Sequence, residues 1–324
     1  MGFSEEFVKN ASKEVVSKSI KSDYAFVENI LKTAVKNAAQ ATPYFRPEDV
    51  LIYLQGSYAC HTNSHFQSKM EVVVEVTRTR EYSYDAMMRN EFKVRDNFYI
   101  DFNHYFDVKR FKDSLAEQLN LLLKQKVVYS DTNLLIPAFG SLQHSVDIFP
   151  CFKYKYFTED GGNMRGKLVY DRHLDDHYLI FTNFHAANGN LKDEMTQGNF
   201  KRMVRFFKNI VAISLREDGK IHRVRGYYIE CLLYNVPTEM FFTADGKLSS
   251  VFLKIINWLN FADLDDFICQ NQIWSLWGNA DGFWNKSAAR QFIHDVIEFY
   301  EAFPSKRTEV IKADDTDKND SKNN

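Results

Sequence analysis

The stretch from Leu51 to Thr77 constrains the fold of this chain more than any other part. It reads LIYLQGSYACHTNSHFQSKMEVVVEVT: an apolar segment, a Gly56-Ser57 turn, a short linker, and a β-branched run from Met70 to Val76. Runs of this length and composition are typical of strands. A Gly-Ser turn offers backbone N–H groups and a hydroxyl to phosphate oxygens. The stretch therefore predicts two strands joined by a turn that suits an anion.

Length and composition indicate a globular protein with ample core. The chain has 324 residues, of which 45% are hydrophobic and 15% aromatic, enough for one large domain or two moderate ones. Only the segment from Lys306 onward is poor in apolar residues, and we expect it to be disordered. The net charge of −2 provides no overall attraction to nucleic acid or membrane, so a phosphate site must depend on local charge.

No segment predicts a secreted or membrane protein. The longest apolar runs fall well short of the roughly 18–20 residues that span a bilayer, and the first residues lack the apolar core of a signal peptide. The cysteines are widely spaced without a CxxC pair, at positions Cys60, Cys151, Cys231 and Cys269. Such spacing fits a reducing cytoplasm better than a disulfide framework or a zinc site. We expect a cytoplasmic protein with no membrane partner and no strong nucleic-acid signal.

Apolar periodicity predicts a first half built from helices and strands. Residues 4–40 have helical spacing, as one long helix or two joined helices bracing the sheet. A second helix is predicted over residues 105–126. Strands are predicted at 127–129, at 134–137 on a sheet edge because of Pro137, and from Ser145 to Phe152.

The second half reads as helical. Beyond a turn at Gly161-Gly162, helices are predicted over residues 199–216, 227–234, 248–261 and 288–303. We therefore divide the chain into an α/β unit with its N-terminal helix at 1–165, a helical unit at 166–304, and a disordered tail at 305–324.

Several motifs, in this order, resemble the cGAS/DncV-like nucleotidyltransferases (CD-NTases), the signal-making enzymes of bacterial CBASS anti-phage systems. The match runs over roughly residues 20–300. It implies an α+β fold: a bilobal, polymerase-beta-like nucleotidyltransferase with a mixed sheet core, a long N-terminal helix and a helical C-terminal half. The motifs that carry it are Gly56-Ser57-Tyr58, Thr62-Asn63, the strand at 69–76, SVDIFP from Ser145, HAANG from His185, FKRMVRFFK from Phe200 and YIECLLYNVP from Tyr228.

The resemblance implies a set of site residues. Nucleotidyl transfer uses two divalent cations held by carboxylates, Mg²⁺ or Mn²⁺ in an active enzyme. Two acids at i and i+2 share one strand face, and a third comes from a neighbouring strand. The matching positions imply Glu71 and Asp147 as catalytic residues and metal ligands. The implied nucleotide-binding residues are Gly56, Ser57, Lys192, Lys208 and Tyr228.

The strand departs from the family at the metal positions. Where the family has Asp-x-Asp, this chain has Lys69 and Glu71. An ammonium cannot ligate a cation, so we expect Lys69 to pair with Asp147 and to oppose a second metal. The longer Glu71 side chain displaces its carboxylate by about an ångström, which can cost on the order of 100-fold in rate. In addition, Gly226 stands where the family usually has a serine near the nucleotide.

Other candidate groups have structural alternatives. Glu75 shares the face of Glu71 but lies about 13 Å along the strand. His173 and His177 are the histidines with metal-ligand spacing, at i and i+4, and we expect no metal there. Asp147 and Lys208 each have a structural alternative, as a buried ion pair and as part of a solvated helix face. The tryptophans at 274, 277 and 284 are expected to pack in the core.

Three functions remain open from the sequence. The first is a CD-NTase-like protein of anti-phage defence with an impaired metal site, acting through nucleotide or oligonucleotide binding or by regulating a defence-system partner protein. The second is an active nucleotidyltransferase that uses Glu71 and Asp147 to join NTPs into a cyclic or linear oligonucleotide. The third is an interaction protein that binds no nucleotide and has no cofactor.

Overall fold

The computed structural model describes residues 2–15, 18–41, 45–64, 69–77, 104–157, 163–217, 219, 221–278 and 284–304. Among these residues, no helix combines the length and the apolar character needed to cross a membrane. The turn predicted at Gly161-Gly162 and the tail predicted from residue 305 lie outside the described residues.

The chain divides into two compact units, each made of discontinuous segments. A sheet unit contains Val16–Tyr58 and Lys69–Asn183, and a helical unit contains Met1–Val15, Ala59–Ser68 and Phe184–Asn324. The boundary that we predicted near residue 165 falls inside a strand, because the sheet continues for two strands beyond the point where we ended it.

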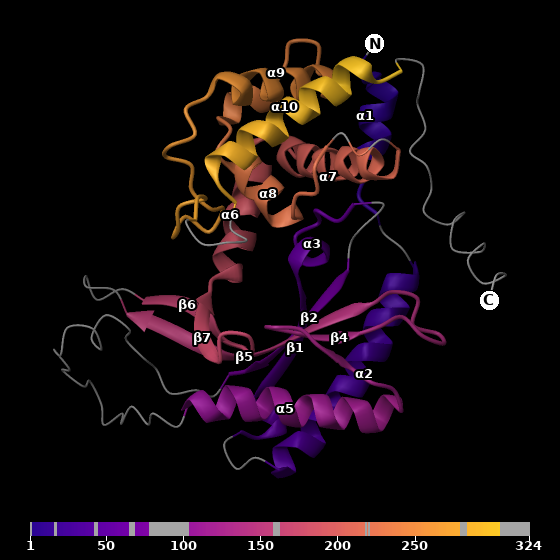
Figure 1. Cartoon of the computed structure of the whole chain (residues 1–324), viewed down its shortest axis with the longest axis vertical. Helices are drawn as coiled ribbons and strands as arrows, with labels where there is room; N and C mark the ends of the chain where they lie inside the picture. Colours follow the sequence, from indigo (N-terminus) through magenta and orange to yellow (C-terminus); the bar gives the residue numbers. More distant parts are fainter. Residues whose placement is uncertain are drawn as a thin grey trace. The chain divides into compact units, whose positions relative to one another are not determined.

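Over the part of the chain that the structure describes, the sheet unit is built on a mixed sheet of seven strands, whose arrangement can be followed in Figure 1. Its path runs β1-β2-β5-β4-β3, and β6 and β7 extend it from β5. The β2–β5 pair is parallel and the other pairs are antiparallel. The strands are β1 Val50–Gln55, β2 Met70–Val76, β3 Val128–Tyr129, β4 Leu134–Ile136, β5 Val146–Phe157, β6 Asn163–Asp171 and β7 Asp176–Ile180.

Two helices, α2 (Lys18–Ala41) and α5 (His104–Leu123), cover one face of this sheet (Figure 1). Their apolar sides bury Leu31 and Leu115 against Val72 and Val74 of β2. The alternate residue Val73 belongs instead to a small apolar cluster on the opposite face, because successive side chains of a strand point to opposite faces. A short 3-10 helix, η1 (Pro47–Asp49), precedes β1, and a four-residue helix, α3 (Gly56–Ala59), follows it.

Two strand predictions were wrong. We expected helices after residue 162, but β6 and β7 form a hairpin on the long strand β5. Their sequences mix charged and polar residues with few β-branched ones, so pairing with β5, rather than local propensity, makes them strands. β4 is not an edge strand, since β3 pairs with it on the side away from β5, and Pro137 falls just after its last residue.

Among the described residues, most helical elements of the helical unit pack around one large apolar core. The central helix, α7, buries most of its length, including Phe206 and Phe207. The elements are α1 Glu5–Ala11, α6 Thr182–Met195, α7 Asn199–Glu217, α8 Gly226–Tyr234, the 3-10 helix η2 Thr238–Phe241, α9 Leu248–Phe261 and α10 Lys286–Ala302.

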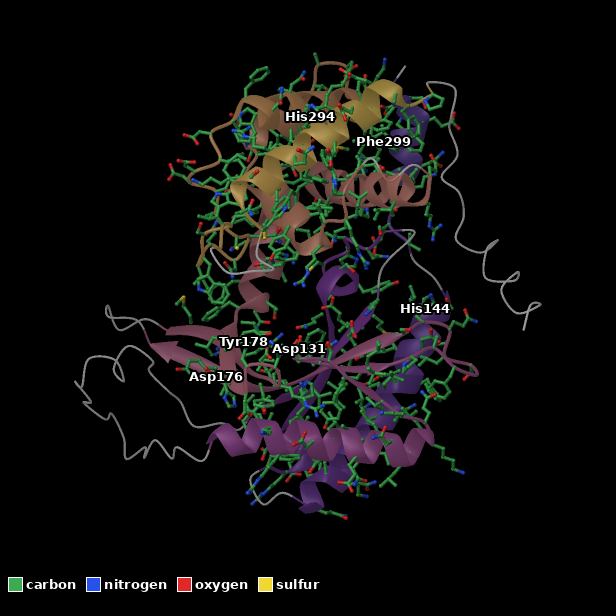
Figure 2. All side chains as sticks on the ribbon, viewed as in Figure 1. Asp131, His144, Asp176, Tyr178, His294 and Phe299 are labelled. Carbon is green, nitrogen blue, oxygen red and sulfur yellow. The ribbon has the colours of Figure 1, made fainter. Side chains whose placement is uncertain are left out.

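The N-terminal segment forms two helices that belong to different units. The Ser4 side chain caps α1 by accepting a hydrogen bond from the backbone N–H of Phe7. Phe7 is fully buried in the core of the helical unit. Phe3 packs there against Phe299 of α10, which is labelled in Figure 2, at a ring distance of 6.1 Å. Therefore only α2 braces the sheet, and the expectation that all of residues 4–40 would do so was wrong.

Candidate functional site

The two acids predicted as catalytic meet on neighbouring strands of the sheet unit. Glu71 of β2 and Asp147 of β5 are register partners in the parallel pair, and Gln55 at the end of β1 lies opposite Glu71. Paired residues of adjacent strands point to the same face. Because Val72 and Ile148 face α2 and α5, Glu71 and Asp147 point to the opposite face.

Lys69, directly before β2, reaches Asp147. Its Nζ lies 3.6 Å from Asp147 Oδ2, with 60% of the lysine side chain and 13% of the aspartate side chain exposed. Burial raises the pKa of Asp147, while the charge of Lys69 and hydrogen bonds from Lys69 and Asn133 partly oppose the rise. The expected ion pair between Lys69 and Asp147 is therefore confirmed.

The carboxylate of Glu71 lies against the predicted phosphate-binding turn. A Cβ atom built on Gly56 would come within 2.5 Å of Glu71 Oε2 and 2.8 Å of Oε1. Gly56 also has a φ of +68°, a backbone conformation that residues with a Cβ rarely adopt. Glycine is thus required at this position for its backbone and for the approach of Glu71. Ser57, the next residue, is half-buried in α3.

The predicted metal positions carry two carboxylates, those of Glu71 and Asp147, and the ammonium of Lys69. Within the described residues, no group of three or more His, Cys, Asp and Glu side chains is arranged to hold a metal. Lys69 supplies three donors and no acceptor at the position where the resemblance calls for a carboxylate. Glu71 and Asp147 remain as oxygen donors, and two carboxylates can hold one Mg²⁺ together with water and phosphate oxygens.

Glu75 belongs to a different polar cluster on the same face. It is buried, and its Oε2 accepts a hydrogen bond of 2.5 Å from the hydroxyl of Tyr53. Lys167 of β6 is also buried, and its amine donates to Gln55 Oε1 at 3.0 Å and to Thr182 Oγ1 at 2.6 Å. Sequence reasoning missed Lys167 because nothing local marks β6 as a strand. Its bond to Gln55 links β6 to the residue just before the Gly-Ser turn.

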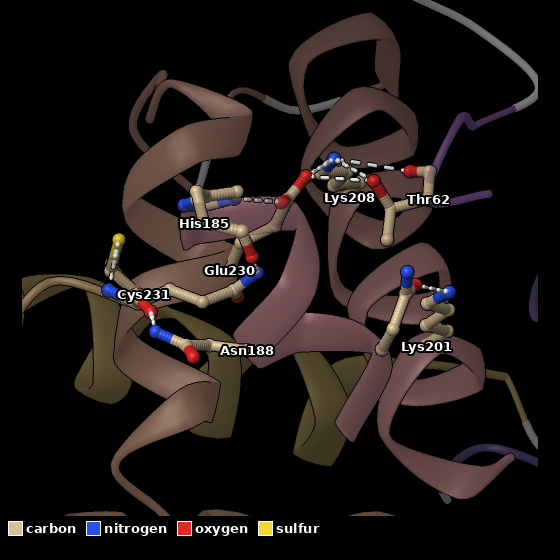
Figure 3. Close-up of polar contacts among 9 residues, drawn as sticks. Thr62, His185, Asn188, Lys201, Lys208, Glu230 and Cys231 are labelled. Atoms are coloured by element: carbon tan, nitrogen blue, oxygen red, sulfur yellow. Dashed lines mark hydrogen bonds and ion pairs between the residues drawn. The ribbon is translucent and has the colours of Figure 1, made fainter. Parts of the chain in front are cut away.

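In the helical unit, Lys208 of α7 forms a buried polar cluster with α8 and the segment after α3 (Figure 3). Its Nζ lies 2.5 Å from Glu230 Oε1 and donates to the backbone oxygen of Thr62 at 3.0 Å. His185 of α6 binds the other carboxylate oxygen of Glu230 through Nε2, at 2.7 Å. Lys208 is thus not part of a solvated face. Glu230 and His185 were not predicted as partners, because they come from helices distant in sequence.

The other two nucleotide-binding candidates of this unit have structural contacts of their own. The amine of Lys192 donates to the backbone oxygen of Val236 at 2.7 Å and lies 5.6 Å from the ring centre of Phe241. Burial lowers the pKa of Lys192. Tyr228 stacks on Trp284 with ring centres 5.3 Å apart. Their predicted nucleotide contacts remain predictions.

The remaining candidates are two histidines and three tryptophans. His173 lies in the turn between β6 and β7 and His177 in β7, so their four-residue spacing does not put them on one helix face. Trp284 is buried in the core, and the indole N–H of Trp277 donates to the backbone oxygen of Leu264. Packing roles for these two tryptophans are confirmed, while 44% of Trp274 is exposed.

Comparison with known proteins gives consistent similarities. Residues 187–301 match the cGAS/DncV-like nucleotidyltransferase C-terminal helical domain. The cyclic UMP-AMP synthase of Rhodothermus marinus is 28% identical over 255 residues, covering 78% of this chain and 83% of that protein. The cyclic dipurine nucleotide synthase of Elizabethkingia meningoseptica is 31% identical over 216 residues, covering 64% of this chain and 70% of that protein.

A solved structure extends the similarity to the fold. The Rhodothermus marinus CdnE c-UMP-AMP synthase, solved with Apcpp and Upnpp, aligns with a TM-score of 0.75 at 22% sequence identity. The alignment covers 94% of this chain and 99% of that one. The expected α+β nucleotidyltransferase fold is confirmed by this likeness.

Proposed function

The chain belongs to the cGAS/DncV-like nucleotidyltransferase family, and from this premise we propose that it binds nucleoside triphosphates or an oligonucleotide signal while its nucleotidyl transfer is impaired. The single observation that carries the proposal is the ion pair between Lys69 and Asp147. Two relatives are named as cyclic nucleotide synthases, which supports nucleotides as the ligand class. The proposed setting is bacterial anti-phage defence of the CBASS type, in the cytoplasm, where the bound state regulates a partner protein.

Lys69 opposes metal binding in two ways. It neutralises the carboxylate that would attract a cation, and it repels the cation with its own charge. Two unit charges about 4 Å apart near a protein surface interact by about 4 kcal/mol, and a divalent cation doubles the charge on one side. Solvent screening reduces this figure, because 60% of the Lys69 side chain is exposed. The sign remains unfavourable for a metal as long as the lysine stays on Asp147.

The same ammonium is compatible with a triphosphate. Lysine binds phosphate as a point charge. Lys69 lies beside Asp147, so its ammonium can neutralise phosphate charge that Mg²⁺ neutralises in an active enzyme. Nucleotide binding by this chain should therefore depend little on a divalent cation. Transfer depends on one, because it needs an attacking hydroxyl with a lowered pKa.

A second candidate function is an active nucleotidyltransferase that uses one Mg²⁺ or Mn²⁺. The observation in its favour is the register pairing of Glu71 with Asp147, which gives two oxygen donors on adjacent strands. This function requires Lys69 to swing away from Asp147 into solvent, which its exposure permits.

One experiment separates these functions. The full chain is incubated with labelled ATP, GTP, CTP and UTP and with Mg²⁺ or Mn²⁺, and products are resolved by chromatography. Binding is measured in parallel by calorimetry with and without EDTA. We expect nucleotide binding that survives EDTA and no product above the Asp147→Asn control. Product above that control would establish the active function, and absence of binding at millimolar nucleotide would favour the interaction protein.

A restoration variant tests the cause of the impairment. Lys69→Asp combined with Glu71→Asp rebuilds the acidic pair, and Lys69→Asn with Glu71→Asp is the matched control that removes the ammonium, keeps a carboxylate at position 71 and adds none at position 69. We expect metal-dependent product from the first variant only. Equal products from both, or none from either, would refute the role assigned to Lys69.

A further inference from the structure

The ammonium of Lys208 already uses all its hydrogen-bond donors. An ammonium has three donors. Those of Lys208 go to Glu230 Oε1 at 2.5 Å, to the backbone oxygen of Thr62 at 3.0 Å and to Thr62 Oγ1 at 3.4 Å (Figure 3). A phosphate that binds Lys208, as the family resemblance implies, must therefore replace at least one of these acceptors.

Glu230 is the strongest of these acceptors, because it is a buried carboxylate. Its side chain is 7% exposed and that of Lys208 is 10% exposed. Burial alone would raise the pKa of Glu230, but the charge of Lys208 and the hydrogen bond from His185 hold it well below its usual range. His185 Nδ1 is buried and has no hydrogen-bond partner among the described residues. His185 therefore contacts the cluster through Nε2, and Lys208 supplies a positive charge opposite the carboxylate.

We propose that Glu230 is an internal competitor for Lys208, so that this lysine binds a triphosphate only when it leaves Glu230. The inference rests on the nucleotide binding proposed above, and it adds that Glu230 limits the affinity of this binding. The exchange is feasible because Glu230 keeps two donors when Lys208 departs: Thr62 Oγ1 at 2.8 Å and His185 Nε2 at 2.7 Å.

Gly226 gives Lys208 the room to lie on Glu230. A Cβ atom built at Gly226 would come 2.9 Å from Lys208 Cε and 3.3 Å from its Nζ. Any larger side chain at this position, including the serine usual in the family, must push the end of the lysine aside. Two residues therefore favour the position of Lys208 on Glu230. Gly226 leaves space for the end of the lysine, and Glu230 attracts its charge.

The test removes the charge of the competitor and measures anion affinity. Binding of inorganic tripolyphosphate and of ATP to the full chain is measured by calorimetry without divalent cations. Glu230→Gln should bind both about tenfold more tightly than the unmodified protein, because the phosphate then has no carboxylate to displace. Its melting temperature without ligand should fall, since a buried Lys208 loses its counter-charge. Opposite changes in stability and affinity distinguish competition from a merely structural role.

Two controls accompany this variant. Lys208→Met in the Glu230→Gln background should abolish the gain in affinity. Asp295→Asn is the matched control: Asp295 is a buried carboxylate of the same unit whose Oδ2 lies 2.8 Å from His222 Nδ1. It should lower the melting temperature and leave tripolyphosphate affinity unchanged. If Glu230→Gln does not fold, Glu230→Asp, which draws the carboxylate back while keeping its charge, should give a smaller gain.

The outcomes separate this inference from the proposed function. If the unmodified protein binds ATP and Glu230→Gln binds it equally or more weakly, competition by Glu230 is refuted while nucleotide binding stands. If neither protein binds ATP or tripolyphosphate although both are folded, both proposals fail. A gain that persists after Lys208→Met would also overturn the inference, because it would not act through Lys208.

Discussion

Replacing Lys208 by methionine tests how strongly the buried pair stabilises the helical unit. Methionine keeps the unbranched stem but leaves Glu230 buried without its cation. Breaking a buried ion pair by removing one partner typically costs about 3–5 kcal/mol. Because Glu230 retains its hydrogen bonds from Thr62 and His185, we expect the lower end of this range, about 3 kcal/mol.

The assay is urea unfolding of the full chain followed by tryptophan fluorescence. All four tryptophans belong to the helical unit, so the signal follows the unit that contains the pair. The matched double variant, Lys208→Met with Glu230→Gln, leaves neither charge behind and should be more stable than Lys208→Met alone. A loss below about 1 kcal/mol for Lys208→Met would refute the reasoning, since that is the range of an exposed pair.

The pH dependence gives a second check on the same variant. In the unmodified protein the pKa of Glu230 lies far below its ordinary value of 4.5. Its contribution to stability is therefore fully present above that pH and is lost as the pH falls toward the folded pKa. In Lys208→Met the carboxyl can take up a proton more readily, so the deficit should shrink between about pH 7 and pH 4. An equal deficit at both pH values would argue against an uncompensated charge.

Three further changes probe the sheet unit. Gly56→Ala should destabilise it by about 1–3 kcal/mol in urea unfolding followed by circular dichroism, because of the positive φ and the contact with the Glu71 carboxylate; a neutral effect would contradict this. Tyr53→Phe should cost about 1.5–3 kcal/mol in the same assay, because buried Glu75 loses a donor, whereas an exposed Tyr→Phe exchange should cost nothing. Lys69→Met should raise the pKa of Asp147 further, as followed by NMR titration of its carboxyl carbon, and a fall would exclude the ion pair.

The spacing of apolar residues correctly predicted those helices and strands whose own sequence has a clear helical or strand pattern. The helix predicted over residues 248–261 is observed as α9 with the same bounds, and the predicted run from Met70 to Val76 is β2. Strand alternation also put Lys69 and Glu71 on one face. The prediction that Lys69 pairs with Asp147 also required β2 and β5 to be neighbours, and the structure confirms both the pairing of the strands and the ion pair.

Elements that depend on distant partners were missed. β6 and β7 are strands because β5 continues far enough to pair with them, and Lys167 escaped notice with them. The sequence of α1 shows that one side of the helix is apolar, but this side could pack against any apolar surface. In the structure Phe7 of α1 packs against Phe206 and Phe303, which lie far along the chain. Periodicity reports which face of a helix is apolar but not which core receives it.

The order of the motifs indicated the family, and the resemblance implied the fold class and showed Lys69 in place of an expected metal ligand. The partners of the charged side chains became apparent from the folded chain. It brought Lys69 to Asp147, set the Glu71 carboxylate against Gly56, and joined Lys208 to Glu230 in a buried cluster. Such partners cannot be derived from local sequence, because the energy of a charge depends on its burial and on the groups within a few ångströms, which long-range packing brings together.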